Sequence, residues 1–288
     1  MAWCSTSPRT AGLALILSLA APLAAAQSDA KPPSRFEWFP VGGGFRSPVA
    51  DPAEPRVAIS RLNVKRDAGE FQAARANIGY DFGVLQLQGP RADDGWRLGV
   101  FGSIDSLFNL DLPGDALVNT DYRIGLPLSW RRGALSARAR LYHQSSHLGD
   151  ELILGGNAPR RINLSYEGVD ALAAWEYGGW RVYGGGSYAF SSSTDLYKGG
   201  GAQLGFDFVG SRSFLLGMRP TAGVDVKWLE ATDWRSGTSV KVGTMVGRYS
   251  PDRRGFTFFV EAYDGFAPFG QFFVEDIRYY GVGAQFDF

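Results

Sequence analysis

Both histidines of the chain fall in one short stretch, Tyr142-His143-Gln144-Ser145-Ser146-His147-Leu148-Gly149-Asp150-Glu151. On a β-strand, His143 and Ser145 share one face, and their backbones lie about 6.5–7 Å apart. An imidazole nitrogen that reaches a serine hydroxyl can take its proton and make it a nucleophile. The spacing therefore permits serine hydrolase chemistry, with Ser145 as the nucleophile and His143 as the base.

A base of this kind needs a third group that orients its ring. Asn163, on the next predicted strand, is the first candidate, and Glu167 is the reserve. Asn163 shares a face with Val169, Ala171, Ala173 and Trp175 if these face lipid. The pattern of Ile162, Leu164 and Tyr166 favours the opposite register.

The same stretch admits two other interpretations. His143 and His147 could bind a metal ion with Asp150 and Glu151, but four strand residues separate the two rings by about 13 Å. Such a site needs a turn at Gly149. In the other interpretation, His143 is a structural or interfacial residue on a strand.

Apolar and polar residues alternate along most of the chain after residue 56, as in a strand with one lipid-facing and one wet face. In the last segment, Tyr280, Val282, Ala284, Phe286 and Phe288 alternate with small or polar residues. The predicted strands cover 57–65, 71–88, 95–105, 119–129, 134–145, 160–176, 180–190, 201–209, 219–230, 238–249, 255–263 and 278–288. The expected fold class is all-β, a transmembrane antiparallel β-barrel of about 12 strands, as bacterial barrels have an even strand number.

Composition and charge agree with this class. The chain has 38 Gly, 20 Phe, 12 Tyr and 8 Trp, a composition rich in turns and aromatics. Its 29 basic and 29 acidic side chains leave no net charge, which excludes a nucleic-acid binder that relies on bulk electrostatics. Cys4 lies in a predicted signal peptide, so the mature chain offers no disulfide and no thiolate metal site.

Three segments are expected: a signal peptide at 1–26, an irregular Pro- and Gly-rich lead-in at 27–56, and an outer-membrane barrel at 57–288. Phe288 is expected at the periplasmic rim, and the loop 146–159 outside the cell. Inward arginines, among them Arg97, Arg138 and Arg140, are expected to form a solvated or paired network in the lumen.

His143-Gln144-Ser145 followed by Arg161-Ile162-Asn163 resembles the outer-membrane phospholipase A family, and Thr120-Asp121-Tyr122-Arg123 looks similar too. The resemblance implies a twelve-stranded barrel in which Ser145, His143 and Asn163 form the catalytic set. It also implies calcium bound by the loop after the serine, with Ser146, Asp150 and Glu151 as the substitutes here. The terminal Phe286-Asp287-Phe288 resembles the signature by which the outer-membrane assembly machinery recognises barrels.

The chain more closely resembles an uncharacterised bacterial family known as a domain of unknown function. The likeness runs through Asp51-Pro52-Ala53-Glu54-Pro55-Arg56 and the stretch from Tyr142 to Glu151, and it spans most of the mature chain. The expected function is a phospholipase A-type ester hydrolase whose partners are membrane lipids of the outer leaflet. The alternatives are a non-enzymatic structural or pore-forming barrel and an enzyme that acts on lipid A. A homodimer is left open.

Overall fold

The computed structural model describes residues 36–287 except 43, 92, 156–161 and 248–254. The predicted signal peptide and Phe288 lie outside the described residues. The strands are β1 (Phe36–Trp38), β2 (Val57–Arg66), β3 (Gly69–Gln88), β4 (Gly95–Asn109), β5 (Ala116–Arg132), β6 (Leu135–Leu148), β7 (Leu164–Tyr177), β8 (Trp180–Ser192), β9 (Gly199–Val209), β10 (Met218–Leu229), β11 (Ser236–Gly247), β12 (Gly255–Phe266) and β13 (Asp276–Asp287). The described helical segments are α1 (Asp150–Leu154), η1 (Leu215–Gly217), η2 (Glu230–Thr232) and η3 (Gly270–Phe272). None of these helices is long and apolar enough to cross a membrane.

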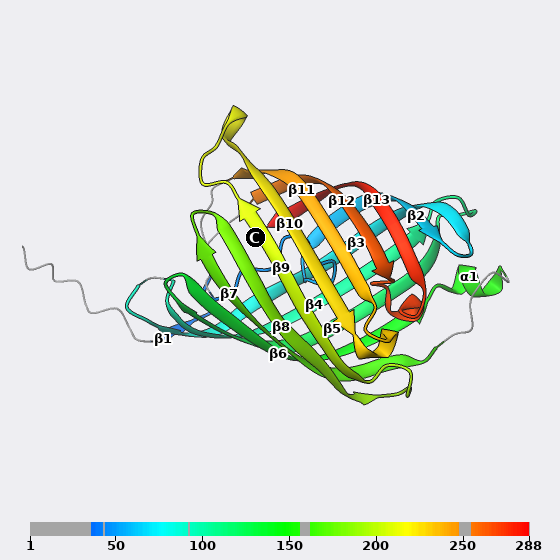
Figure 1. Ribbon diagram of the computed structural model, residues 1–288, viewed down its shortest axis with the longest axis horizontal. Helices are drawn as coiled ribbons and strands as arrows, with labels where there is room; N and C mark the ends of the chain where they lie inside the picture. Colours follow the sequence, from blue (N-terminus) through cyan, green and yellow to red (C-terminus); the bar gives the residue numbers. More distant parts are fainter. Residues whose placement is uncertain (1–35, 43, 92, 156–161, 248–254, 288) are drawn as a thin grey trace, which may run out of the picture. The chain divides into compact units, whose positions relative to one another are not determined.

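Strands β2 to β13 form a closed antiparallel barrel (Figure 1). Each strand pairs with its neighbours in sequence, and β13 pairs with β2 to close the ring, from Ile277 opposite Arg66 to Phe286 opposite Val57. The twelve-stranded barrel that the alternation predicts is therefore confirmed. The three-residue strand β1 pairs with the last residues of β3, at the end of the barrel where β2 begins and β13 ends.

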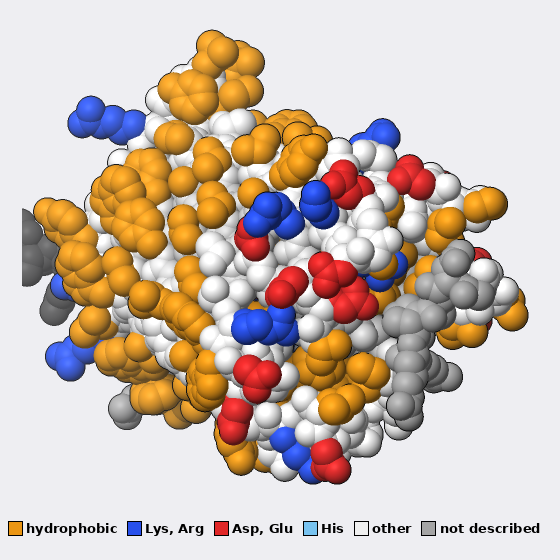
Figure 2. Space-filling model, turned by 45° about the vertical axis from the view of Figure 1, so that its right-hand side comes forward, with side chains coloured by type: hydrophobic (Ala, Val, Ile, Leu, Met, Phe, Trp, Pro, Cys, Tyr) orange, Lys and Arg blue, Asp and Glu red, His pale blue; other side chains and the backbone are white. Residues whose placement is uncertain are grey.

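Polar and apolar residues alternate along β6 as predicted, with the polar side chains facing the lumen. Ser136, Arg138 and Arg140 are buried inside the barrel, whereas Leu135 and Leu141 are exposed on its outer wall. Aromatic pairs gather near the end that carries the short turns, among them Trp96 with Trp130, Trp180 with Phe208, and Phe256 with Phe286. Such a belt marks a membrane interface. Figure 2 shows the apolar wall, with acidic and basic side chains gathered toward the end of the longer loops.

Several strands run further than predicted. The loop expected at 106–118 is confined to the residues between Asn109, which ends β4, and Ala116, which begins β5. Leu107, Val118 and Leu148 face inward here and belong to an apolar cluster at the barrel's outer end. At this level the inward side chains are apolar because they pack against other parts of the protein. The alternation of apolar and polar residues therefore ends before the strands do.

That apolar cluster is completed by the segment 267–275 between β12 and β13. Ala267, Phe269 and Phe272 are buried in it, and the backbone N–H of Gly270 donates to Asp121 of β5 at 3.0 Å. The Gln271 side chain donates to the backbone carbonyls of Ser146 and Ile162 at 2.7 and 2.8 Å. This outer cap, defined as residues 267–275, thus occupies the barrel mouth at the end of the longer loops.

The last part of the lead-in lies inside the barrel, near the end that carries the short turns. After β1 the chain enters the lumen, where Gly44, Ala50, Asp51 and Glu54 are buried. We call residues 44–56 the inner plug. The prediction of an irregular lead-in did not include its position inside the barrel, where its charged groups meet the inward arginines.

Candidate functional site

Four polar side chains form a compact group on the outer wall of β6 and β7. His143 lies opposite Glu167 in the ladder between these strands, and Ser145 lies opposite Ser165. All four project outward, because inward positions on these strands, such as Gln144 and Tyr166, are buried. We call His143, Ser145, Ser165 and Glu167 the outer-wall quartet.

The imidazole of His143 has partners at both ring nitrogens. Nδ1 lies 3.0 Å from Oε1 of Glu167, and Nε2 lies 3.4 Å from Oγ of Ser165. The His143 and Glu167 side chains are 44% and 45% exposed. A carboxylate on Nδ1 favours the tautomer whose Nε2 accepts a proton, which is the arrangement of a general base. The quartet can therefore activate a hydroxyl on the lipid-facing wall.

Two predicted site residues have different surroundings from those expected. Ser145 is half-buried on the outer wall, but the hydroxyl that contacts the imidazole is that of Ser165. Asn163 precedes β7 and is exposed, and its backbone carbonyl accepts from Oγ of Ser193 at 2.6 Å. The ring partner on β7 is Glu167, the reserve candidate. The structure does not bring Asn163 to His143.

Sequence reasoning missed Ser165. The signal was present, because Ser165 has the same parity on its strand as Glu167 and Val169. Its position beside the imidazole depends on the register between β6 and β7, which strand parity alone does not reveal.

The three residues predicted to hold calcium do not come together as one site. Ser146 faces the lumen, and its hydroxyl donates to Asp121. Asp150 and Glu151 are exposed in the first turn of α1. Among the described residues no three His, Cys, Asp or Glu side chains are grouped to hold a metal ion. His147 instead packs edge-on against Tyr122, with ring centroids 5.8 Å apart.

The most concentrated charges lie inside the barrel, around the inner plug. The Glu54 carboxylate accepts from Arg138 at 2.7 and 2.8 Å and from Arg140 at 2.9 Å. Burial opposes its charged form, but Arg138 and Arg140 outweigh burial and hold the pKa of Glu54 well below its usual value. Asp51 accepts from Lys227 at 2.6 Å and from Gln203 at 3.0 Å. These contacts fasten the plug to three barrel strands, β6, β9 and β10.

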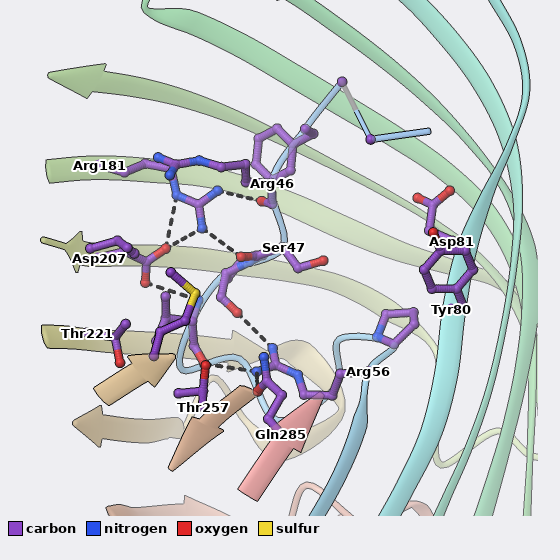
Figure 3. A pocket seen from close by; sticks show the side chains of 18 of the residues that line it. Arg46, Ser47, Arg56, Tyr80, Asp81, Arg181, Asp207, Thr221, Thr257 and Gln285 are labelled. Atoms are coloured by element: carbon purple, nitrogen blue, oxygen red, sulfur yellow. Dashed lines mark hydrogen bonds and ion pairs between the residues drawn. The ribbon is translucent and has the colours of Figure 1, made fainter. Parts of the chain in front are cut away.

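Residues of the plug line a cavity of about 450 Å³, which reaches Gly179 in the turn between β7 and β8. Figure 3 shows this cavity and some of the side chains that line it. Arg181 joins Asp207 to the backbone carbonyl of Ser47. Arg56 donates to Gln285 at 2.9 Å and to the backbone carbonyl of Pro48 at 2.7 Å. Most of these cations thus hold backbone or carboxylate groups of the protein itself. This is a structural network, as predicted for the lumen, with the plug as its unpredicted centre.

Fold, polarity and aromatic belt define a bacterial outer-membrane β-barrel. The chain belongs to the family described as "Protein of unknown function (DUF1207)", whose model matches residues 30–288. The predicted membership of such a family is confirmed.

Known proteins agree with the fold. No curated protein matches the chain. The outer membrane phospholipase (OMPLA) dimer with bound calcium from Salmonella typhi is similar, with 14% identity over 82% of this chain and 93% of that chain and a TM-score of 0.54. Outer membrane phospholipase A from Escherichia coli has 12% identity over 81% and 90%, with a TM-score of 0.52. At these identities the likeness concerns the fold alone.

Proposed function

We propose that this barrel is a serine-type carboxylic ester hydrolase that acts on membrane lipids from its outer wall. The observation that carries the proposal is the imidazole of His143, held between the Glu167 carboxylate and a serine hydroxyl on the lipid-facing surface. Polar groups are costly on this surface and usually serve a function. An acyl ester within the bilayer reaches such a site without leaving the membrane.

In the proposed reaction, a serine oxygen attacks the ester carbonyl while His143 Nε2 takes the hydroxyl proton. The tetrahedral intermediate expels the lipid alcohol, which receives that proton from the imidazolium, and an acyl-enzyme remains. Water then attacks the acyl-enzyme, with His143 again taking and returning a proton, and the fatty acid leaves. Glu167 orients the ring and stabilises its transient positive charge.

Either serine of the quartet could supply the nucleophile. The resemblance of His143-Gln144-Ser145 to the phospholipase A family favours Ser145. The 3.4 Å contact favours Ser165, but it is longer than the approximately 2.6–3.2 Å of a formed nucleophile–base pair. We therefore propose Ser145 as the nucleophile and Ser165 as a neighbouring hydroxyl that occupies Nε2 in the absence of substrate.

No step of this mechanism is derived through calcium. Calcium sites need several oxygen ligands around one point, and Ser146 is turned to the lumen while Asp150 and Glu151 lie on α1. The residues expected to hold calcium thus do not fit one ion, and no step is derived through it. The bound calcium belongs to the Salmonella protein.

The pore-forming alternative receives less support. The inner plug and the outer cap occupy the lumen at two levels, and the Glu54 contacts with Arg138 and Arg140 are those of a fixed plug. A structural barrel without activity remains the competing function.

Purified full-length protein in detergent tests the proposal. Dispersed phospholipid should be hydrolysed to fatty acid and lysolipid, and lipid A should be assayed in parallel to separate the two substrate classes. His143→Gln should abolish hydrolysis, whereas His147→Gln on the same wall should retain it. Absence of activity on both lipid classes, from a barrel that is folded by circular dichroism, would leave the structural function.

A further inference from the structure

A second outward feature lies away from the quartet, on the wall formed by β2, β3 and β11 to β13. A groove of about 800 Å³ runs over this wall. Its lining is apolar or small apart from one charged side chain, and includes Ile59, Arg61, Ala74, Val260, Val282 and Ala284. Arg61 of β2 is exposed within this groove.

The ladder fixes the level of Arg61. It pairs with Val282, which pairs with Val260, which pairs with Val242. These three valines are 58%, 55% and 50% exposed. Arg61 therefore lies in a row of neighbouring residues across the strands whose other members present aliphatic side chains to lipid.

The rows above and below Arg61 mark the limits of the apolar band. Four residues toward the short-turn end, Val57 pairs with Phe286 of the aromatic belt. Four residues toward the longer loops, Lys65 pairs with Arg278, whose guanidinium binds Asp264 at 2.6 Å. Arg61 is thus enclosed between an interface of aromatic residues and an interface of charged residues.

Other outward cations near this wall have carboxylate partners. Lys65 binds Glu70 at 2.9 Å, and Arg278 binds Asp264. Within the part of the chain that the structure describes, the Arg61 guanidinium has no hydrogen bond or ion pair with another residue. An arginine on the lipid face of a barrel destabilises it unless the charge reaches an anion or the interface. The charge of Arg61 must therefore be stabilised from outside the chain, by an anion or by the membrane interface.

We propose that the groove binds one anionic phosphorylated membrane lipid, with its phosphate on Arg61 and an acyl chain along the apolar lining. The guanidinium can extend along the wall toward the charged row, where phosphate groups of the outer leaflet lie, and can donate two parallel hydrogen bonds to phosphate oxygens. The small side chains of Ala74 and Ala284 leave room for the acyl chain. This site is separate from the quartet on β6 and β7 and does not depend on its activity.

Native mass spectrometry of the detergent-purified full chain tests the site. The probes are ether-linked phosphatidylglycerol and ether-linked phosphatidylcholine with identical chains, which an ester hydrolase cannot cleave. Wild type should retain phosphatidylglycerol preferentially, and Arg61→Gln should reduce that retention about tenfold, as loss of a charge-assisted bond does. Lys65→Gln, on the same face outside the groove, should retain the preference.

A second variant tests the apolar part. Ala284→Trp should fill the groove and lower retention of both lipids while the barrel stays folded. Equal retention by wild type and Arg61→Gln would overturn the proposal, as would binding of inorganic phosphate alone with no lipid preference. A protein dimer that excludes lipid and dissociates in Arg61→Gln would also overturn it, because a second copy would then be the occupant.

Discussion

At the scale of single residues, strand parity separates two adjacent serines. Ser145 faces outward with His143, whereas Ser146 faces the lumen and donates to Asp121. We expect Ser145→Ala to lower the hydrolysis rate by several orders of magnitude, as removal of a nucleophile does. Ser146→Ala should leave the rate within about threefold, although it deprives a buried carboxylate of one donor at a cost of about 1–3 kcal/mol.

A fluorophosphonate probe provides the measurement. Wild type and Ser146→Ala should be labelled, and Ser145→Ala should not, while all three migrate as heat-modifiable barrels. Labelling of Ser165 in the wild type, located by peptide mass spectrometry, would assign the nucleophile to β7 and keep His143 as the base.

Glu167 provides a prediction of its own. Glu167→Gln keeps the side chain's size but can present an amide N–H to Nδ1, which favours the wrong tautomer and should lower kcat about 10²–10⁴-fold with little change in KM. Glu167→Asp should recover part of the loss. Glu70→Gln, an exposed outer-wall carboxylate bound to Lys65, is the matched control and should have no effect on kcat. An unchanged kcat in Glu167→Gln would remove Glu167 from the mechanism.

At the scale of elements, the inner plug is fastened by buried charge. Glu54→Gln leaves Arg138 without its carboxylate, whereas Arg140 keeps its ion pair with Asp170 at 2.9 Å. Breaking a buried pair in this way costs about 3–5 kcal/mol. We expect the plug to become protease-sensitive in Glu54→Gln while the barrel strands stay protected. Glu70→Gln, which removes an exposed ion pair, should change stability by less than about 1 kcal/mol.

The pH dependence of this attachment follows from the direction of the pKa shift. The pKa of Glu54 is lowered in the folded protein, so its stabilisation is fully present above the unfolded value of about 4.3 and is lost as pH falls through the lower folded value. Between about pH 5 and 8, Glu54 should therefore cause no change in the urea concentration at the midpoint of plug release. It should fall below about pH 4 in wild type, and much less in Glu54→Gln.

The strands could be predicted from the sequence because the alternation of apolar and polar residues is a local pattern within each strand. Along β6, Leu135 and Leu141 alternate with Ser136 and Arg138, and this local pattern gives both the strand and its faces. The plug could not be predicted in this way. Glu54 and Arg138 are 84 positions apart, and nothing in the local pattern around Glu54 indicates that a barrel encloses it. The contact of Ser165 with His143 likewise depends on a register between two strands.

At the scale of the whole barrel, the short turns and the longer loops predict its orientation in the membrane, because outer-membrane barrels place their longer loops outside. A tag placed after Gly155, at the end of α1, should be labelled on intact cells. An inaccessible tag on a properly inserted barrel would reverse the orientation and place the quartet near the periplasmic leaflet.

The path of the inner plug has a mechanical consequence. The plug enters beside β1 and leaves into β2, and both lie at the same rim, so it is an inserted loop that could withdraw without opening the β2–β13 seam. A pull on the N-terminal side would load its contacts in sequence, starting with the three residues of β1, as in peeling. A pull between β2 and β13 would load ten residue pairs together in shear. The plug should therefore yield at a much lower force than the wall that surrounds it.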